Sequence, residues 1–423
     1  MSVTAQPEAR RPRSLISTAR VPRVLFVEPN DDGTVGGSHQ VLLDFARNID
    51  RRRYEPVAVF YQDNVFVARL RDAGVEVHLL ADAWHREKTV MRSGRRLLQG
   101  RMFVEAVARR VRFLRQHDIS ILHINGTPQT GHDDWLPAAF LLGMPAVANC
   151  AGNVQFDVRS FMQRAFMRSF DHVLAVSSHV GKQVVDFGYE PTRVTTIHPG
   201  IDLDGFRSRV GKSADQVRAE LSVPADTMLV TMVGNIRPWK GQHVAIDAMS
   251  RLPDATRRKI LLLIVGPAAA GDSSYEAELR ERVKRDRLEP QVRFLGLRTD
   301  VPDLMAASDV VLHASTEAEP FGLVVVEGMA LGRPVIASSI GGPTEILDRR
   351  SGLMFSPDRP QDLARHLSVL ASQPERRREL GEAGRARAQK FSIASTVRET
   401  MRLYDQLLGK RPVGRTAGRS AET

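Results

Sequence analysis

Cysteine, aromatic side chains and long apolar runs are all scarce in this chain of 423 residues. The single Cys150 excludes an internal disulfide and is compatible with a reducing cytoplasm. Aromatic residues make up only 6% of the chain, which disfavours nucleic-acid binding by base stacking. The longest apolar runs, such as residues 260–265, have the length of a strand and are too short to span a membrane. Residues 1–22 contain no apolar segment typical of a signal peptide, so we expect a cytoplasmic protein. The low aromatic content leads us to expect no nucleic-acid partner.

The net charge of +11 is unevenly distributed along the chain. Residues 1–22 carry four arginines and one acid, and residues 409–423 carry four basic residues and one acid, so each end contributes +3 and the body +5. Both ends are rich in Pro, Gly, Ser and Arg, which predicts disordered basic tails at 1–21 and 409–423. Such tails either keep the protein soluble or contact a polyanion such as an anionic membrane.

Short apolar runs alternate with helical patterns from residue 23 onward, which predicts parallel sheets with helices on both faces. A polar stretch at 202–213 interrupts this alternation and is predicted to link two domains, as the length of the chain also suggests. We therefore predict an α/β fold of two Rossmann-like, doubly wound domains, 22–205 and 206–394, facing each other across a cleft, with a final helix at 395–408. The predicted strands are 24–27, 54–61, 75–80, 119–124, 146–149, 173–176, 194–197, 228–233, 259–266, 292–295, 310–312 and 334–337.

The most informative stretch, residues 319–330, has two carboxylates eight residues apart. Glu319 precedes a predicted helix, Glu327 lies inside it, and Pro320 suits the first helical turn. Free backbone N–H groups at such a helix N-terminus form an anion site. A diphosphate flanked by a sugar and a ribose would satisfy the N–H groups and both carboxylates. The N–H groups are those of Phe321, Gly322 and Leu323.

One further motif follows the first strand of each half. Gly36 and Gly37 can bring backbone N–H groups close to a phosphate, although a tight turn explains the pair about as well. The third glycine of a dinucleotide fingerprint is missing, which disfavours NAD. Lys240, one of only eight lysines, follows residues 234–239 and can neutralise a leaving diphosphate; a solvated loop charge is the alternative.

We expect no metal site and no cofactor. Asp202 and Asp204 form a D-x-D pair in the predicted linker, where a capping role is the commoner one for Asp, and Asp133 with Asp134 is interpreted in the same way. The twelve histidines show no metal-ligand spacing. His123, at the end of a predicted strand, is the histidine best placed for the cleft.

A basic helical pattern runs from Arg92 to Arg115 with eight arginines, and Glu105 is its only acid. Apolar residues are interleaved at helical spacing, which is typical of a helix that lies on anionic lipid. A helix packed on the sheet with a solvated basic face explains the pattern at least as well. Residues 161–168 have a similar pattern.

Over roughly residues 22–408 the chain resembles the retaining glycosyltransferases of family 4, which have the two-domain GT-B fold. Any single motif would be weak, but their order and spacing make the resemblance specific. The motifs are residues 234–241, 264–266, 292–296, 309–312, 319–327 and 341–345.

The resemblance implies a metal-independent glycosyltransferase that moves a sugar from a nucleotide diphosphate to a hydroxyl of a glycan or lipid-linked glycan, with retained configuration. Such enzymes act in polysaccharide and cell-envelope synthesis, in the cytoplasm or peripherally at the inner face of the membrane. Glu319 would hold the donor sugar, Glu327 the ribose and Lys240 the diphosphate. The leaving phosphate oxygen would accept the acceptor's proton in a front-face displacement. The remaining implied donor-binding residues are Gly36, Gly37, Gly234, Asn235, Arg237, Leu297, Phe321, Gly322 and Leu323.

His123 and Asn125 are expected on the acceptor side of the cleft. The sequence departs from the family pattern twice: Asn235 stands where many members carry an arginine, for which Arg237 could substitute, and Ala151 stands where many place a histidine. Two other functions therefore stay open. One is a nucleotide-sugar epimerase or hydrolase on the same fold, and the other is a non-catalytic subunit that binds nucleotide sugars.

Overall fold

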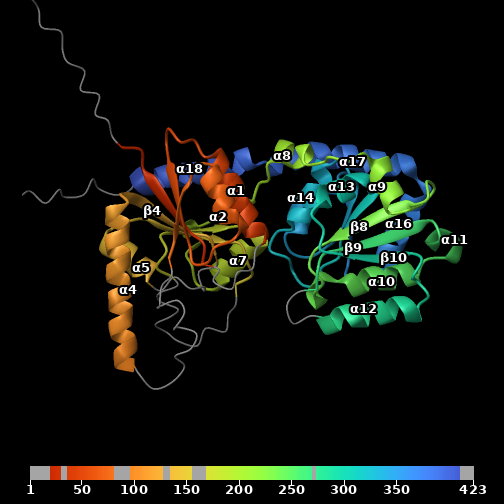
Figure 1. The fold of residues 1–423 in the computed structure, drawn as a ribbon, viewed down its shortest axis with the longest axis horizontal. Coiled ribbons are helices and arrows are strands. Elements are labelled where there is room, and N and C mark those ends of the chain that lie inside the picture. Colours follow the sequence, from red (N-terminus) through yellow and green to blue (C-terminus); the bar gives the residue numbers. More distant parts are fainter. Residues whose placement is uncertain are drawn as a thin grey trace, which may run out of the picture.

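The computed structural model describes residues 20–29, 36–80, 96–126, 134–154, 168–268 and 273–409, which form two α/β domains side by side (Figure 1). Predictions for the two tails, the loop at 30–34, Asp133, residues 92–95 and most of 161–168 lie outside these ranges. The first domain's strands are β1 (Arg23–Val27), β2 (Glu55–Phe60), β3 (Glu76–Leu79), β4 (Ile119–Ile124), β5 (Ala146–Cys150), β6 (His172–Ala175) and β7 (Val194–Thr196). The second domain's strands are β8 (Met228–Val233), β9 (Ile260–Val265), β10 (Val292–Gly296), β11 (Val310–His313), β12 (Val335–Ser338) and β13 (Leu353–Phe355).

Both sheets are parallel and doubly wound. Their strand orders are β3-β2-β1-β4-β5-β6-β7 and β10-β9-β8-β11-β12-β13, so each sheet grows in both directions from its first strand. In such sheets ligands bind beyond the carboxyl ends of the strands, near the point where the order reverses. The predicted fold class of two Rossmann-like domains is confirmed.

Helices cover both sheets, and the short helices η1 (Pro191–Arg193), η2 (Pro238–Lys240) and η3 (Gln389–Phe391) join other elements. The first domain contains α1 (Gly37–Asn48), α2 (Val65–Asp72), α4 (Arg96–Gln116), α5 (Trp135–Leu141) and α7 (Ser178–Asp186). In chain order, α8 (Leu203–Ser208) and α9 (Ala214–Glu220) come between the two sets of strands. The later helices are α10 (Gln242–Ser250), α11 (Asp254–Arg257), α12 (Ser273–Arg285), α13 (Val301–Ala307), α14 (Leu323–Ala330), α15 (Pro343–Ile346), α16 (Pro360–Ser372), α17 (Pro374–Ala388) and α18 (Ile393–Gly409).

Burial explains why the strands were readable in the sequence. All six residues of β9 are apolar and buried, as expected for a central parallel strand covered on both faces. Strand β13, which has three residues, was not predicted. The predicted linker also contains α8, a short helix whose N-terminus is capped by Asp202 through a 2.9 Å hydrogen bond to the Gly205 N–H. The capping interpretation of Asp202 is therefore confirmed. Among the described residues, no helix is long and apolar enough to cross a membrane.

The last helix, α18, packs against the first domain although it follows the second in sequence (Figure 1). Its apolar residues recur at helical spacing, and Val397, Met401 and Tyr404 join the core around β1 and α1. The Tyr404 hydroxyl lies 2.6 Å from Nδ1 of His123, and both residues are buried. The core of the first domain is thus completed by a helix that follows the second domain in sequence.

Polar contacts join the domains near the cleft. Glu345 of α15 accepts hydrogen bonds from the first backbone N–H groups of α7, those of Ser178 (2.9 Å) and His179 (3.1 Å). The amide of Asn153 in the first domain donates a 2.8 Å hydrogen bond to the carbonyl oxygen of Ala318 in the second. These contacts hold the two sheets so that the carboxyl ends of their strands border one cleft.

Candidate active site

The cleft between the domains has a volume of about 430 Å³. Its lining includes Val233 at the end of β8 and Asn149 near the end of β5, so it lies at the carboxyl ends of strands from both sheets. The remaining lining residues are Gly37, Ser38, Val41, Ala151, Val176, Pro199, Gly234, Lys240, Glu319, Pro320, Phe321, Gly322, Leu323, Val324 and Glu327.

Glu319 is at the centre of a hydrogen-bond network in this cleft. Its Oε1 lies 2.8 Å from Nζ of Lys240, and its Oε2 lies 2.7 Å from Nε2 of His313. Ser315 donates a further hydrogen bond of 2.8 Å to Oε2. Both carboxylate oxygens therefore have partners, and the side chain is held in one orientation at the cleft wall.

These partners keep Glu319 ionised. Burial alone would raise the pKa of this carboxyl, but His313 and Lys240 outweigh burial, so the pKa lies well below its usual range. Lys240 also lies over the ring of Trp239, with 4.2 Å between Nζ and the ring centroid. The cleft thus holds a fixed carboxylate beside a lysine that can interact with a second anion.

The helix behind Glu319 begins later than predicted. Helix α14 starts at Leu323, so the prediction that Pro320 occupies its first turn is wrong. Gly322 is the N-cap in a left-handed conformation (φ 103°), which favours glycine and turns the chain sharply into the helix. The amide of Val325 bonds to the carbonyl oxygen of Gly322, which leaves the preceding N–H groups at this helix end for an anion.

The loop before α14 rests on the glycine-rich motif at 341–345. The amide of Gly342 donates a 2.8 Å hydrogen bond to the carbonyl oxygen of Glu319. A Cβ atom at Gly342 would lie 2.3 Å from the Cα atom of Phe321. The Phe321 ring is buried and lies near His198 and Phe391, with ring centroids 5.6 and 5.8 Å apart. Only a glycine lets these two backbone segments pack so closely.

The first domain contributes the N-terminus of α1 to the opposite wall. Gly37 is the first residue of this helix, and a Cβ atom on it would lie 2.7 Å from Cδ1 of Leu323. The N-termini of α1 and α14 therefore meet across the cleft. Gly36 precedes α1 and does not line the cleft, and a Cβ atom on it would meet nothing within 4 Å.

Glu327 lies one turn into α14 and borders the cleft on one side and a second cavity on the other. Within the described residues its carboxyl group has no hydrogen-bond partner. Burial raises the pKa of this carboxyl to about 7, with an opposing contribution from Arg209 and a smaller supporting one from Asp44. A pair of hydroxyls would provide the hydrogen bonds that this carboxyl lacks.

Besides Gly36, three predicted donor residues lie outside the cleft lining. The backbone carbonyl oxygen of Asn235 accepts a hydrogen bond from the side chain of Gln242, and Arg237 precedes the short helix η2. Leu297 follows β10 and is 77% exposed. Gly234, by contrast, lines the cleft beside Lys240, as the sequence suggested.

The two residues predicted for the acceptor side also lie behind the cleft. His123 is buried against Tyr404, and burial lowers its pKa to about 3, so it is a neutral core histidine. Asn125 bonds to Glu28 at 2.6 Å and accepts a 3.0 Å hydrogen bond from Asn149. Asn149 lines the cleft, so its hydrogen bond links Asn125 to the cleft wall.

His313 is the site residue that sequence reasoning did not assign to the site. It ends β11, six residues before Glu319. Its ring is buried and bonds to Glu319 through Nε2, while Nδ1 lies 3.3 Å from Oγ of Ser338. A histidine at the end of a central strand just before an acidic motif was the signal available.

Two facing Rossmann-like domains with an anion-binding, carboxylate-lined cleft are the architecture of the GT-B glycosyltransferases. Two family profiles divide the chain in the same way: "Glycosyltransferase Family 4" matches residues 35–204, and "Glycosyl transferases group 1" matches residues 213–387. The chain belongs to the family 4 glycosyltransferases.

Curated relatives share about 30% of the aligned residues. The chain is 30% identical over 246 residues to D-inositol 3-phosphate glycosyltransferase of Corynebacterium glutamicum, an alignment covering 57% of this chain and 59% of the relative. It is 32% identical over 248 residues to the enzyme of the same name from Corynebacterium kroppenstedtii, covering 56% and 54%. The similarity thus spans little more than half the length of these relatives.

Solved structures cover nearly the whole chain. The crystal structure of Anabaena HepE in complex with UDP is 25% identical, covers 91% of this chain and 100% of its own, and gives a TM-score of 0.75. Its complex with UDP-glucose is also 25% identical, covers 91% and 99%, and gives a TM-score of 0.73. A glycosyltransferase from Rickettsia africae, 18% identical and covering 92% and 100%, shares the fold with a TM-score of 0.78.

Proposed function

We propose that this protein transfers a sugar from a UDP-sugar to a hydroxyl of a glycan or lipid-linked glycan, with retention of configuration. The observation that carries the proposal is the ion pair between Lys240 and Glu319 at the N-terminus of α14, facing the N-terminus of α1 across the cleft. Two helix N-termini and a lysine offer positive charge to a diphosphate, and Glu319 accepts hydrogen bonds from sugar hydroxyls. The UDP and UDP-glucose complexes of Anabaena HepE support uracil as the base.

Charge in the cleft changes during such a transfer. Departure of the UDP leaving group concentrates negative charge on the diphosphate, and groups positioned for that charge stabilise the transition state more than the ground state. Lys240 can shift from Glu319 toward the diphosphate, while His313 and Ser315 keep Glu319 in place. Because lysine and backbone N–H groups supply this stabilisation, we propose that the transfer step itself needs no metal ion.

Ligand-induced stabilisation tests the donor assignment. We expect UDP to raise the melting temperature and GDP, ADP, CMP and dTDP to do so less, since a ligand at a hundred times its dissociation constant adds about 2.7 kcal/mol. Glu327→Gln should lose most of the UDP effect. If no nucleotide stabilises the folded protein, the donor assignment is wrong.

Product analysis separates the transferase from the other two functions. A transferase turns over UDP-glucose fully only with an acceptor, so glycans, lipid-linked glycans and D-inositol 3-phosphate should each be tested. An epimerase or hydrolase consumes the donor without an acceptor. A non-catalytic subunit binds UDP and consumes nothing with any of them.

We also propose that the first domain contacts an anionic membrane at the cytoplasmic face. Arg101, Arg112 and Arg115 of α4 are exposed, and Val104 between them is 65% exposed. The neighbouring helix α5 has two exposed apolar residues at its end, Phe140 (82%) and Leu141 (67%). Exposed apolar side chains beside arginines are typical of helices that lie on anionic lipid.

Vesicle sedimentation tests this surface. The protein should bind vesicles containing phosphatidylglycerol at low salt, and high salt should weaken binding because it screens exposed charges. Replacing Arg112 and Arg115 by glutamine should reduce binding, whereas replacing Arg349 and Arg350, two exposed arginines of the second domain, should not. Equal binding by both double variants would contradict the proposal.

A further inference from the structure

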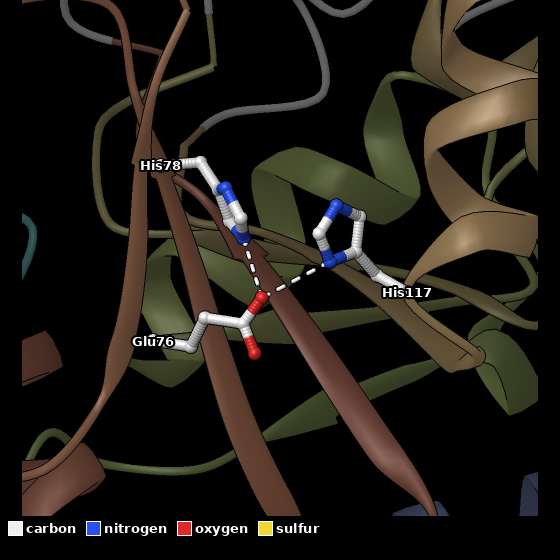
Figure 2. A group of neighbouring side chains, drawn as sticks. All are labelled: Glu76, His78 and His117. Carbon is white, nitrogen blue, oxygen red and sulfur yellow. Dashed lines mark hydrogen bonds and ion pairs between the residues drawn. The ribbon is translucent and has the colours of Figure 1, made fainter.

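Three potential metal ligands converge at one edge of the first domain, away from the cleft. Oε1 of Glu76 lies 2.7 Å from Nε2 of His78 and 3.0 Å from Nδ1 of His117 (Figure 2). All three ligand atoms lie within 4.8 Å of one another. Among the described residues, this is the one group of three or more His, Cys, Asp or Glu side chains that meets this distance criterion.

The fold brings these residues together from two elements. Glu76 and His78 are two residues apart on β3, so their side chains lie on the same face of this edge strand. His117 directly follows α4 and precedes β4. Glu76 is the first residue of β3, so the cluster lies at the amino ends of the parallel strands, opposite the end that forms the cleft.

Neighbouring side chains orient the three groups. The ring of Phe113 packs against both imidazoles, with centroid distances of 5.1 Å to His78 and 4.3 Å to His117. Arg23 donates hydrogen bonds to Oε2 of Glu76 and to the carbonyl oxygen of His117. The Glu76 oxygen that faces the histidines is therefore not the one held by Arg23, and outer contacts of this kind commonly position metal ligands.

The donor set suits a divalent transition metal, and in particular Zn²⁺. Imidazole nitrogens and a carboxylate oxygen are common zinc ligands at about 2.0–2.2 Å, which places neighbouring ligand atoms about 3.3 Å apart in a tetrahedron. The hydrogen-bonded contacts of 2.7 and 3.0 Å would need to open by only a few tenths of an ångström. The side chains of Glu76, His78 and His117 are 40%, 26% and 19% exposed, so an ion and a water ligand have access.

Two charges near the cluster act in opposite directions. The guanidinium of Arg23 disfavours a cation, but its charge is shared between Glu76 and Glu55, whose Oε2 lies 3.4 Å from Nε of Arg23. The carboxyl end of α4 lies beside His117, and the partial negative charge at a helix C-terminus favours a cation. Binding also requires both histidines to carry their proton on the other ring nitrogen, since the facing nitrogens must be free of hydrogen.

We propose that Glu76, His78 and His117 form a site for Zn²⁺ or a similar divalent transition metal, with water as the fourth ligand. The ion would tie the edge strand β3 to the end of α4, two segments separated by 41 positions along the chain. Its place at the amino ends of the strands gives it a stabilising role that does not depend on the transferase reaction. The hydrogen-bonded cluster without an ion is the alternative that an experiment must exclude.

Zinc binding to the full-length protein tests the site directly. After dialysis against a chelator, calorimetric titration should show one zinc per chain and a higher melting temperature with zinc. His78→Gln and His117→Gln should lose both effects, and His366→Gln, a half-buried histidine of the second domain, should keep them. Cobalt substitution should give the intense visible absorption of tetrahedral Co²⁺ in the wild type only.

Two outcomes would overturn the proposal. One is a folded wild-type protein that binds no zinc, which would leave the cluster as a set of hydrogen bonds. The other is zinc binding that survives both His78→Gln and His117→Gln, which would place the ion elsewhere in the chain. Far-ultraviolet circular dichroism of each variant shows whether the lost binding reflects an unfolded protein.

Discussion

Nε2 of His198, just beyond the last strand of the first domain, lies 2.9 Å from Oε2 of Glu345 on α15 of the second domain. The same carboxylate caps α7 through two backbone N–H groups. One side chain therefore holds a helix N-terminus and a histidine of the facing domain, and this contact orients the two walls of the cleft.

Removing this carboxylate should loosen the domain contact. Glu345→Ala leaves the first N–H groups of α7 without their acceptor, which should cost about 1–3 kcal/mol of unfolding free energy. Asp186→Ala, which breaks the exposed pair with Lys182, is the control and should cost at most about 1 kcal/mol. Denaturant titration measures both.

The cost of Glu345→Ala should also depend on pH. Burial opposes ionisation of Glu345, but His198 and the α7 N–H groups outweigh burial and lower its pKa. A lowered pKa stabilises the folded state above the unfolded-state pKa, and this contribution disappears as the pH falls through the folded-state value. The difference between wild type and variant should therefore shrink in acid; an unchanged difference would contradict the charge-based account.

Glu327 should have the opposite dependence. Its pKa is raised to about 7 from an ordinary 4.5, chiefly by burial, so its contribution to folding is lost as the pH rises from about 4.5 to about 7. Glu327→Gln should therefore be more stable than the wild type at about pH 8, by at most about 3 kcal/mol, and similar to it below about pH 4.5. Denaturation at both pH values tests this, and an equal difference at both would show that Glu327 titrates normally.

Lys240 and Glu319 should both be needed for turnover. Loss of a preorganised charge at the diphosphate should lower kcat about a hundredfold to a thousandfold in Lys240→Met. Glu319→Gln keeps the size of the side chain but not its charge, and it should lower kcat more than it weakens UDP binding. Initial rates and UDP titrations separate the two effects, and wild-type kcat in either variant would contradict the assignment.

Gly342 and Gly36 form a matched pair for a steric prediction. Gly342→Ala places a methyl group 2.3 Å from the backbone of Phe321, so it should cost about 2 kcal/mol or more and disturb the loop that carries Glu319. Gly36→Ala meets nothing within 4 Å, and the backbone there is extended, so its stability should be close to that of the wild type. Thermal unfolding and UDP binding of both variants check this, and equal effects would show that backbone crowding is not the cause.

The sequence predicted the strands well because central parallel strands are continuous apolar runs. The buried run of β9 was visible within a residue at each end, whereas β13, with three residues of which only Phe355 is buried, was missed. The start of α14 was misplaced because Pro320 is typical of a first helical turn, while the left-handed Gly322 delays the helix by three residues.

Residues brought together by tertiary contacts were harder to predict. Glu319 and Lys240 belong to motifs with a readable spacing, but His313 looked like any histidine at the end of a strand. His123 was assigned to the cleft because it ends a predicted strand. A single segment does not show which way its side chains point, and the partner of His123, Tyr404, lies 281 positions away. Glu76 and His117 likewise meet only after β3 and α4 are placed.

The position of α18 has a consequence for how the protein is made. Tyr404, fully buried, and Met401 belong to the core formed by β1 and α1, yet they follow the second domain along the chain and so leave the ribosome after it. Domains generally fold as units during synthesis, starting from the N-terminus. The second domain can therefore bury its own core while the surface of the first domain that α18 covers is still exposed. The first domain emerges before the second but completes its core after it.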